Sequence, residues 1–77
     1  MANNNDNTTS SASQNAMILE WMDKGNTIMA LQALDLFGCM RLASRIFDLR
    51  ERGHNIKKEK VTLPSGKIVT RYSLIKE

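Results

Sequence analysis

A glycine between two helical patterns is the feature of this chain that most restricts its fold. Residues 28–37 and residues 39–52 each repeat apolar side chains at helical spacing, and only the Phe37-Gly38-Cys39 corner separates them. A connection this short forces the two helices to cross steeply, and it leaves one face of the later helix pointing outward. The pair therefore predicts a helix-turn-helix unit.

The earlier helix of this pair has the sequence IMALQALDLF over residues 28–37. Thr27 precedes it, and a threonine at this position can cap the first turn of a helix. Gln32 and Asp35 form a narrow polar strip on a surface that is otherwise apolar nearly all round. A short helix of this kind is expected to be sandwiched in a core.

The later helix, residues 39–52, has an apolar and a polar arc on a helical wheel, and Gly53 ends it. Arg41, Arg45 and Arg52 gather on the polar arc, while Arg50 falls alone on the apolar side. Asp48 follows Arg45 by three residues, so the two side chains can pair. The expected apolar arc consists of Leu49, Leu42, Ile46, Cys39, Ala43, Phe47 and Met40.

The N-terminal part of the chain divides into a tail and one further helix. Residues 1–14 are almost entirely Asn, Ser, Thr and other small residues, which cannot bury enough surface to order a chain. We expect a disordered polar tail there and a folded domain over residues 15–77. Residues 15–25 (NAMILEWMDKG) place Met, Ile, Leu and Trp side chains on one arc, which predicts an amphipathic helix that stops at Gly25.

The C-terminal part changes from helical spacing to β-branched residues. Residues 54–63 and 67–75 read as two strands, and the Leu63-Pro64-Ser65-Gly66 sequence suits a type I turn closed by a glycine bulge. The first strand alternates poorly, because Ile56 and Val61 have opposite parity, so we expect a bulge or a short strand. The predicted fold is mainly α (α+β): a three-helix helix-turn-helix core with a C-terminal β-hairpin wing.

Charge is distributed unevenly along the chain. Residues 1–37 contain one Lys and four acidic residues, a balance of −3, whereas residues 38–77 contain ten Lys and Arg and four acidic residues, a balance of +6. Such asymmetry points to a polyanionic partner, usually a nucleic acid.

Candidate contact residues follow from this charge and from the outward face of the later helix. Arginine offers a planar fork for guanine, and recognition helices use mainly their N-terminal part, which favours Arg41, Ser44 and Arg45 at base edges and Arg52 at phosphate. On this helix the expected DNA-binding residues are Met40, Arg41, Ser44, Arg45, Asp48 and Arg52. In the wing they are Lys57, Lys58, Lys60, Lys67 and Arg71, and Thr27 is added at the start of the earlier helix.

Other function classes find little support in the sequence. Cys39 and His54 are the only cysteine and histidine, too few for a structural zinc site, so we expect no metal, no cofactor and no catalytic activity. No apolar run approaches the roughly 20 residues of a membrane span, and the N-terminus does not resemble a secretory signal. We therefore expect a cytoplasmic protein with neither a membrane nor a small-molecule substrate as partner.

Four stretches of the sequence carry a resemblance to known domains, namely 33–38 (ALDLFG), 41–50 (RLASRIFDLR), 53–56 (GHNI) and 71–74 (RYSL). They resemble a family of small winged helix-turn-helix domains common in phages and prophages. The resemblance implies a winged helix that binds double-stranded DNA. It suggests a transcription regulator or an excisionase-like accessory factor, and it does not choose between the two.

Two further possibilities remain open at this point. A module of the same fold can instead bind a host or helper protein through its basic face. A domain this small also covers a limited area of DNA, so a homodimer or cooperative assembly on repeated sites is expected to supply affinity. Met17, Ile18 and Trp21 are candidate residues for a dimer or partner surface.

Overall fold

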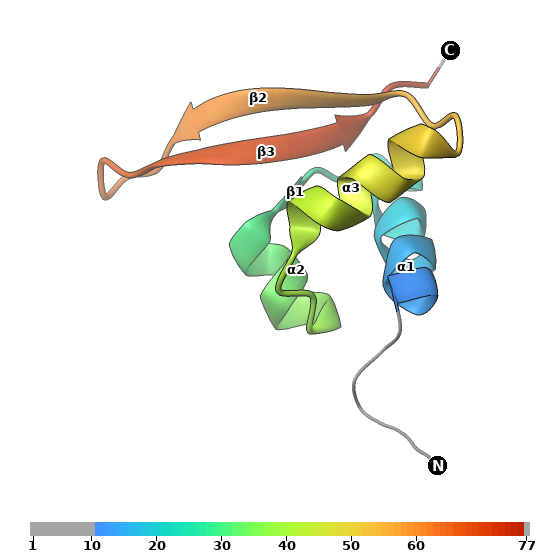
Figure 1. The fold of residues 1–77 in the computed structure, drawn as a ribbon. Coiled ribbons are helices and arrows are strands. Elements are labelled where there is room, and N and C mark those ends of the chain that lie inside the picture. Colours follow the sequence, from blue (N-terminus) through green and yellow to red (C-terminus); the bar gives the residue numbers. More distant parts are fainter. Residues whose placement is uncertain (1–10, 77) are drawn as a thin grey trace.

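The computed structural model describes residues 11–76 and shows three helices beneath a three-stranded antiparallel sheet (Figure 1). The β2–β3 hairpin runs along one side of the helices, and its turn projects beyond them (Figure 1). This arrangement confirms the predicted class, a helix-turn-helix core followed by a wing. The elements are α1 Ser11–Asp23, β1 Ile28–Met29, α2 Ala30–Phe37, α3 Leu42–Glu51, β2 Ile56–Thr62 and β3 Ile68–Leu74.

Helix α1 starts earlier than the sequence predicted. It begins at Ser11, so residues 11–14, which were assigned to the polar tail, are helical, and residues 1–10 lie outside the described part of the chain. Gln14 donates from Nε2 to the carbonyl of Gly38 over 3.4 Å, and the next residue, Asn15, is buried. These contacts with the rest of the domain stabilise the first turn of α1, whose polar composition by itself does not favour a helix.

The chain enters α2 through a short strand that the sequence analysis missed. Ile28 pairs with Tyr72 and Met29 pairs with Arg71, which makes β1 the third strand of a sheet in the order β1-β3-β2. The predicted helix start at Ile28 is therefore wrong, because pairing with β3 satisfies this backbone and buries the Ile28 side chain.

The predicted cap at Thr27 is also wrong. Helix α2 begins at Ala30, and the backbone N–H of Met29 donates to Gln32 Oε1 over 3.0 Å. The carbonyl of Thr27 accepts instead from the indole Nε1 of Trp21 over 2.8 Å. Thr27 thus fixes α1 against the start of the sheet.

The turn between α2 and α3 depends on Gly38. Its φ of 64° lies in the left-handed region, which glycine adopts without steric cost. In this conformation the N–H groups of Gly38 and Cys39 reach the carbonyls of Leu34 and Ala33, at 2.9 and 3.0 Å. Helix α3 then starts at Leu42 and not at the predicted residue 39, so Cys39, Met40 and Arg41 belong to the turn.

The wing is a regular hairpin. Strands β2 and β3 pair without interruption from Ile56 opposite Leu74 to Thr62 opposite Ile68, so the bulge expected in the first strand is absent. The N–H of Gly66 donates to the carbonyl of Leu63 over 2.8 Å, and Gly66 has a φ of 90°. These features confirm the predicted four-residue turn ending in a glycine.

The core lies where the three helices meet the part of the sheet in which β1 pairs with β3. Trp21 and Phe37 pack against it and make an edge-to-face contact with each other, their ring centroids 6.1 Å apart. Helix α2 contributes one buried residue, Ala33, and it leaves Leu31, Leu34 and Leu36 exposed, so the predicted burial of α2 on all sides is wrong. The buried apolar residues are Ile18, Met22, Ile28, Ala33, Cys39, Leu42, Ile46, Leu49 and Ile56.

Candidate nucleic-acid interface

Helix α3 buries a narrower face than its sequence suggested. Leu42, Ile46 and Leu49 point into the core. Ala43 and Phe47 belong to the predicted apolar arc, but both are exposed, and 62% of Phe47 is open to solvent. The outward surface of α3 is therefore partly apolar.

Arg45 points toward α1 and not outward. Its guanidinium Nη2 lies 3.3 Å from the Asp48 carboxylate, and its side chain is 17% exposed. Asn15 on α1 donates from Nδ2 to the same carboxylate over 3.4 Å. Within the described part of the chain, the Asn15 Oδ1 and Arg45 Nε atoms are buried without a hydrogen-bond partner. This polar cluster joins α1 to α3, so the structure separates Arg45 and Asp48 from the outward face.

The start of α3 gathers three of the predicted contact residues. Arg41 precedes the first helical residue and is exposed, and its guanidinium makes no hydrogen bond or ion pair with any described residue. Met40, before it in the turn, is 84% exposed, and Ser44 is half-buried in the first turn of α3. This end of the helix is thus an accessible surface with one unpaired cation.

The other end of α3 carries two more arginines. Arg50 donates from Nε and Nη2 to the carbonyl of Ile56, at 3.2 and 2.8 Å, which fastens the helix to the start of the wing. Arg52 is exposed beyond the last turn, about 15 Å along the helix from Arg41. The structure therefore does not bring Arg52 together with the residues at the start of α3.

The lysines of β2 lie on two different faces of the wing. Residues opposite each other in an antiparallel pair share a face, so Lys58 and Lys60 share the face of Tyr72, which packs on the core. Lys57 lies on the opposite face. Lys58 and Lys60 are exposed, and they extend the cationic surface from the helices along the wing.

Arg71, a predicted wing contact, is paired within the sheet. It lies opposite Glu59 and donates to the Oε2 atom of that side chain, from Nε over 2.9 Å and also from Nη2. The hydrogen bond and charge of Arg71 lower the pKa of Glu59, burial opposes this effect slightly, and the nearby Lys57 lowers the pKa further. Arg71 and Glu59 thus form a neutral pair on the outer face of the wing.

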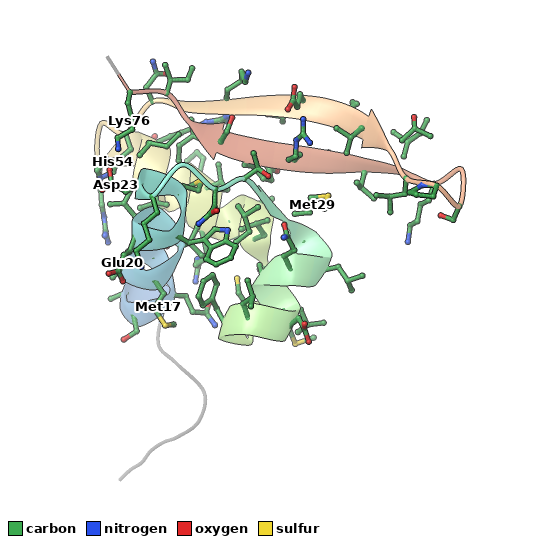
Figure 2. All side chains as sticks on the ribbon, turned by 180° about the vertical axis from the view of Figure 1, so that it is seen from behind. Met17, Glu20, Asp23, Met29, His54 and Lys76 are labelled. Atoms are coloured by element: carbon green, nitrogen blue, oxygen red, sulfur yellow. The ribbon has the colours of Figure 1, made fainter. Side chains whose placement is uncertain are left out.

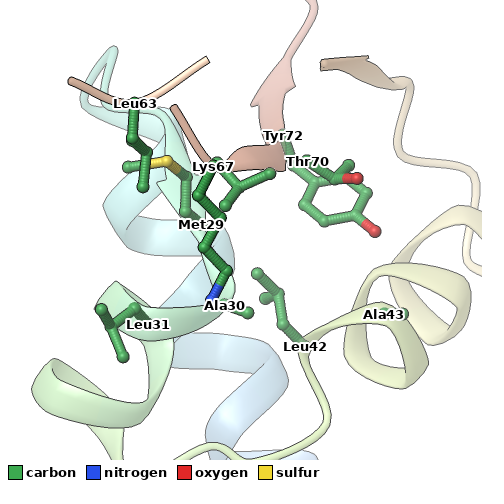
Figure 3. A pocket seen from close by; sticks show the side chains of 10 residues that line it. Met29, Ala30, Leu31, Leu42, Ala43, Leu63, Lys67, Thr70 and Tyr72 are labelled. Atoms are coloured by element: carbon green, nitrogen blue, oxygen red, sulfur yellow. The ribbon is translucent and has the colours of Figure 1, made fainter. Parts of the chain in front are cut away.

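A hollow of about 550 Å³ separates the wing from the start of α2 and α3. Leu63, Val69 and Tyr72 line it from the sheet side, and Leu31 and Leu42 line it from the helices. Lys67 reaches from the wing turn into this hollow, with its ammonium group toward Ala30 (Figure 3). Lys67 and Arg41 therefore flank the beginning of α3.

Other parts of the described structure offer no alternative site. At the far end of the molecule, Lys76 pairs with Asp23 over 3.3 Å, near the half-buried His54 (Figure 2). Over residues 11–76 no group of three His, Cys, Asp or Glu side chains could hold a metal ion. Within that range, no helix is both long and apolar enough to cross a membrane.

Three helices, a glycine turn and a basic hairpin define a winged helix-turn-helix domain. Residues 13–77 match the family of winged helix-turn-helix domains, and the chain belongs to this family. Membership implies binding to double-stranded DNA, and the family is typically non-enzymatic. Comparison with curated proteins and comparison with solved structures each found no match.

Sequence reasoning missed the outward position of Ala43 and Phe47. The available signal was Arg50, which fell on the apolar side of the predicted wheel. An arginine three residues after Phe47 indicates that this edge of the arc meets solvent or another polar group. Reading Arg50 as the limit of the buried face would have placed Phe47 outside.

Proposed function

We propose that this domain binds double-stranded DNA with the start of α3 in the major groove and the wing along the phosphate backbone. One observation carries the proposal: within the described part of the chain, exposed cations without a protein partner lie in the turn before α3 and along the wing. They come from the turn, from the wing turn and from β2, namely Arg41, Lys67, Lys58 and Lys60. An α-helix fits the major groove, and lysines beside it neutralise phosphates.

The biological role proposed is that of a small transcription regulator or of an excisionase-like accessory factor of a phage or mobile element, acting in the cytoplasm. Both roles require the same contacts, since each depends on placing a small domain at a chosen DNA site. Arg45 and Arg71 have internal partners, so they contribute to the shape of the domain, and the four exposed cations named above carry the DNA contact.

Cooperative binding is part of the proposal. One domain of this size covers about 600–1,000 Å² on DNA, which limits its specific affinity. The candidate surface of Met17, Ile18 and Trp21 is not available, because Ile18 is fully buried and Trp21 packs against Phe37. An apolar patch on α2 and the turn after it replaces that surface, and its members are Leu31, Leu34 and Met40.

Fluorescence anisotropy of labelled duplex DNA tests the proposed function. We expect affinity to fall by orders of magnitude between about 50 and 200 mM salt, because phosphate contacts release counterions. Lys58→Ala/Lys60→Ala should reduce the slope of log affinity against log salt by about 2, at roughly 1 for each lost contact. Lys57→Ala, on the opposite face of the wing, is the matched control. Absence of binding at low salt by a folded protein would favour the alternative, a module that binds a protein partner.

A further inference from the structure

The outward surface of α3 carries apolar side chains in addition to its cations. Ala43, Phe47 and Arg50 follow one another at spacings of four and three residues, so they form one stripe along the helix. All three are exposed. Phe47 packs on no described aromatic ring and belongs to neither the buried core nor its edge. Ala43 also lines the hollow under the wing, and Phe47, the next residue of the stripe, is open to solvent. The exposed surface of α3 therefore includes an apolar pair, Ala43 and Phe47.

An exposed phenyl ring gains free energy when a partner covers it. The charges of the neighbouring elements bear on what that partner can be. Arg41 before α3 and Lys58 on the wing face that adjoins the helices are exposed cations, and Glu51, one turn after Phe47, is an exposed carboxylate. A partner consistent with the proposed function carries negative charge that meets Arg41 and Lys58, together with an apolar group that meets the ring.

Duplex DNA supplies this combination in one place. Its phosphates line both edges of the major groove, and the C5-methyl group of thymine is the apolar group that base edges present there. Alanine and phenylalanine side chains both make apolar contacts with this methyl group. The argument rests on the proposed function, in which α3 enters the major groove.

The position of Arg45 strengthens this assignment. A bidentate contact to guanine needs an arginine fork that is free to face the groove. Arg45 is the arginine nearest to the middle of α3 on its N-terminal side, and its guanidinium is held by Asp48 against α1. Between Ala43 and Phe47 the outward face therefore offers apolar contact in place of hydrogen bonding.

We infer that Ala43 and Phe47 read thymine methyl groups in the major groove, so that the domain prefers A·T base pairs at the centre of its site.

Synthetic polymers that differ only in this methyl group test the inference. The probes are the alternating duplexes poly(dA-dT), poly(dA-dU), poly(dG-dC) and poly(dG-5-methyl-dC), titrated at about 50 mM salt. We expect poly(dA-dT) to bind more tightly than poly(dA-dU) by about fourfold for each methyl group covered. Adding the methyl group to cytosine, at the equivalent groove position, should likewise tighten binding to the G·C duplex.

Variants identify the side chain that reads the methyl group. In Phe47→Ala the preference for poly(dA-dT) over poly(dA-dU) should shrink, because Ala43 and the new alanine keep only part of the methyl contact, and Phe47→Leu should retain more of it. Because Phe47 is largely exposed, these variants should fold, and circular dichroism checks this. Lys58→Ala is the control, since it should weaken binding to all four duplexes alike.

The possible failures are distinguishable. Salt-dependent binding with equal affinity for poly(dA-dT) and poly(dA-dU) would overturn the inference and leave the proposed function intact. A thymine preference as large in Phe47→Ala as in the wild type would overturn the assignment to Phe47. No binding to any duplex would remove the proposed function, and the inference with it.

Discussion

The guanidinium of Arg45 lies 3.3 Å from the carboxylate of Asp48, one turn further along α3, and Asn15 of α1 donates to the same carboxylate. This contact gives Arg45 a structural role, since it pairs with the carboxylate through which Asn15 links α1 to α3. The arginines of α3 are thus not equivalent. Arg41 stays accessible at the start of the helix, while Arg45 and Arg50 bind groups of the domain itself.

Removing Asp48 should destabilise the domain. In Asp48→Ala the mostly buried Arg45 loses its counterion and Asn15 loses its acceptor, so the free energy of unfolding should fall by about 1–3 kcal/mol. Urea denaturation followed by circular dichroism measures this change. Glu51→Ala is the matched control, because it removes the same charge from an exposed position on α3. Equal unfolding midpoints for the two variants would contradict a structural role for Asp48.

Gly38 should tolerate asparagine better than alanine. A Cβ atom at this position meets nothing within 4 Å, so the cost of substitution comes from the left-handed backbone alone. Gly38→Ala should lower the free energy of unfolding by about 1–2 kcal/mol, and Gly38→Asn by less, since asparagine enters this region more readily. Thermal or urea unfolding of the two variants measures this difference in the free energy of unfolding. A loss that is the same for both residues would show that steric contact, and not backbone strain, limits position 38.

Local chemistry explains which parts of the fold the sequence predicted. The Gly38 corner and the Leu63–Gly66 turn were recognisable because each depends on a few adjacent residues with special backbone preferences. Strand β1 was not recognisable from the sequence, because Ile28 and Met29 are extended only through pairing with β3, far along the chain. Tertiary pairing overrode the helical spacing of this segment.

The candidate site was predictable in its charges but not in their directions. A helical wheel assigns Arg45 to a polar arc, yet it cannot show that α1 covers that side and supplies Asn15. It also cannot show which edge of a wide apolar arc stays uncovered, and therefore Phe47 was expected in the core. Both features arise from the docking of neighbouring elements, which local periodicity does not encode.

The Glu59–Arg71 pair should make the stability of the wing depend on pH. Arg71 lowers the pKa of Glu59 in the folded state, so the unfolded chain binds a proton at a higher pH than the folded one. The stabilisation is therefore fully present above the unfolded pKa of Glu59, and it is lost as pH falls through the lowered folded pKa. The urea midpoint of the wild type should drop more between pH 7 and pH 3 than that of Glu59→Gln. Glu51→Gln, which removes a carboxylate whose side chain is exposed on α3, should behave as the wild type does.

The α2 apolar patch of Leu31, Leu34 and Met40 should control cooperativity and not folding. Leu31 and Leu34 are 75% and 46% exposed, so replacing both with serine removes little buried surface and should leave the unfolding midpoint within the range of ordinary surface changes. A contact between neighbouring copies on DNA would lose most of its apolar area. On a duplex with two adjacent sites, Leu31→Ser/Leu34→Ser should bind with a Hill coefficient near 1, while affinity for a single site stays within about twofold. Ile68→Ser removes an exposed apolar side chain from the wing and should keep the cooperativity of the wild type. If the α2 variant binds both sites as cooperatively as the wild type does, neighbouring copies do not meet through this patch.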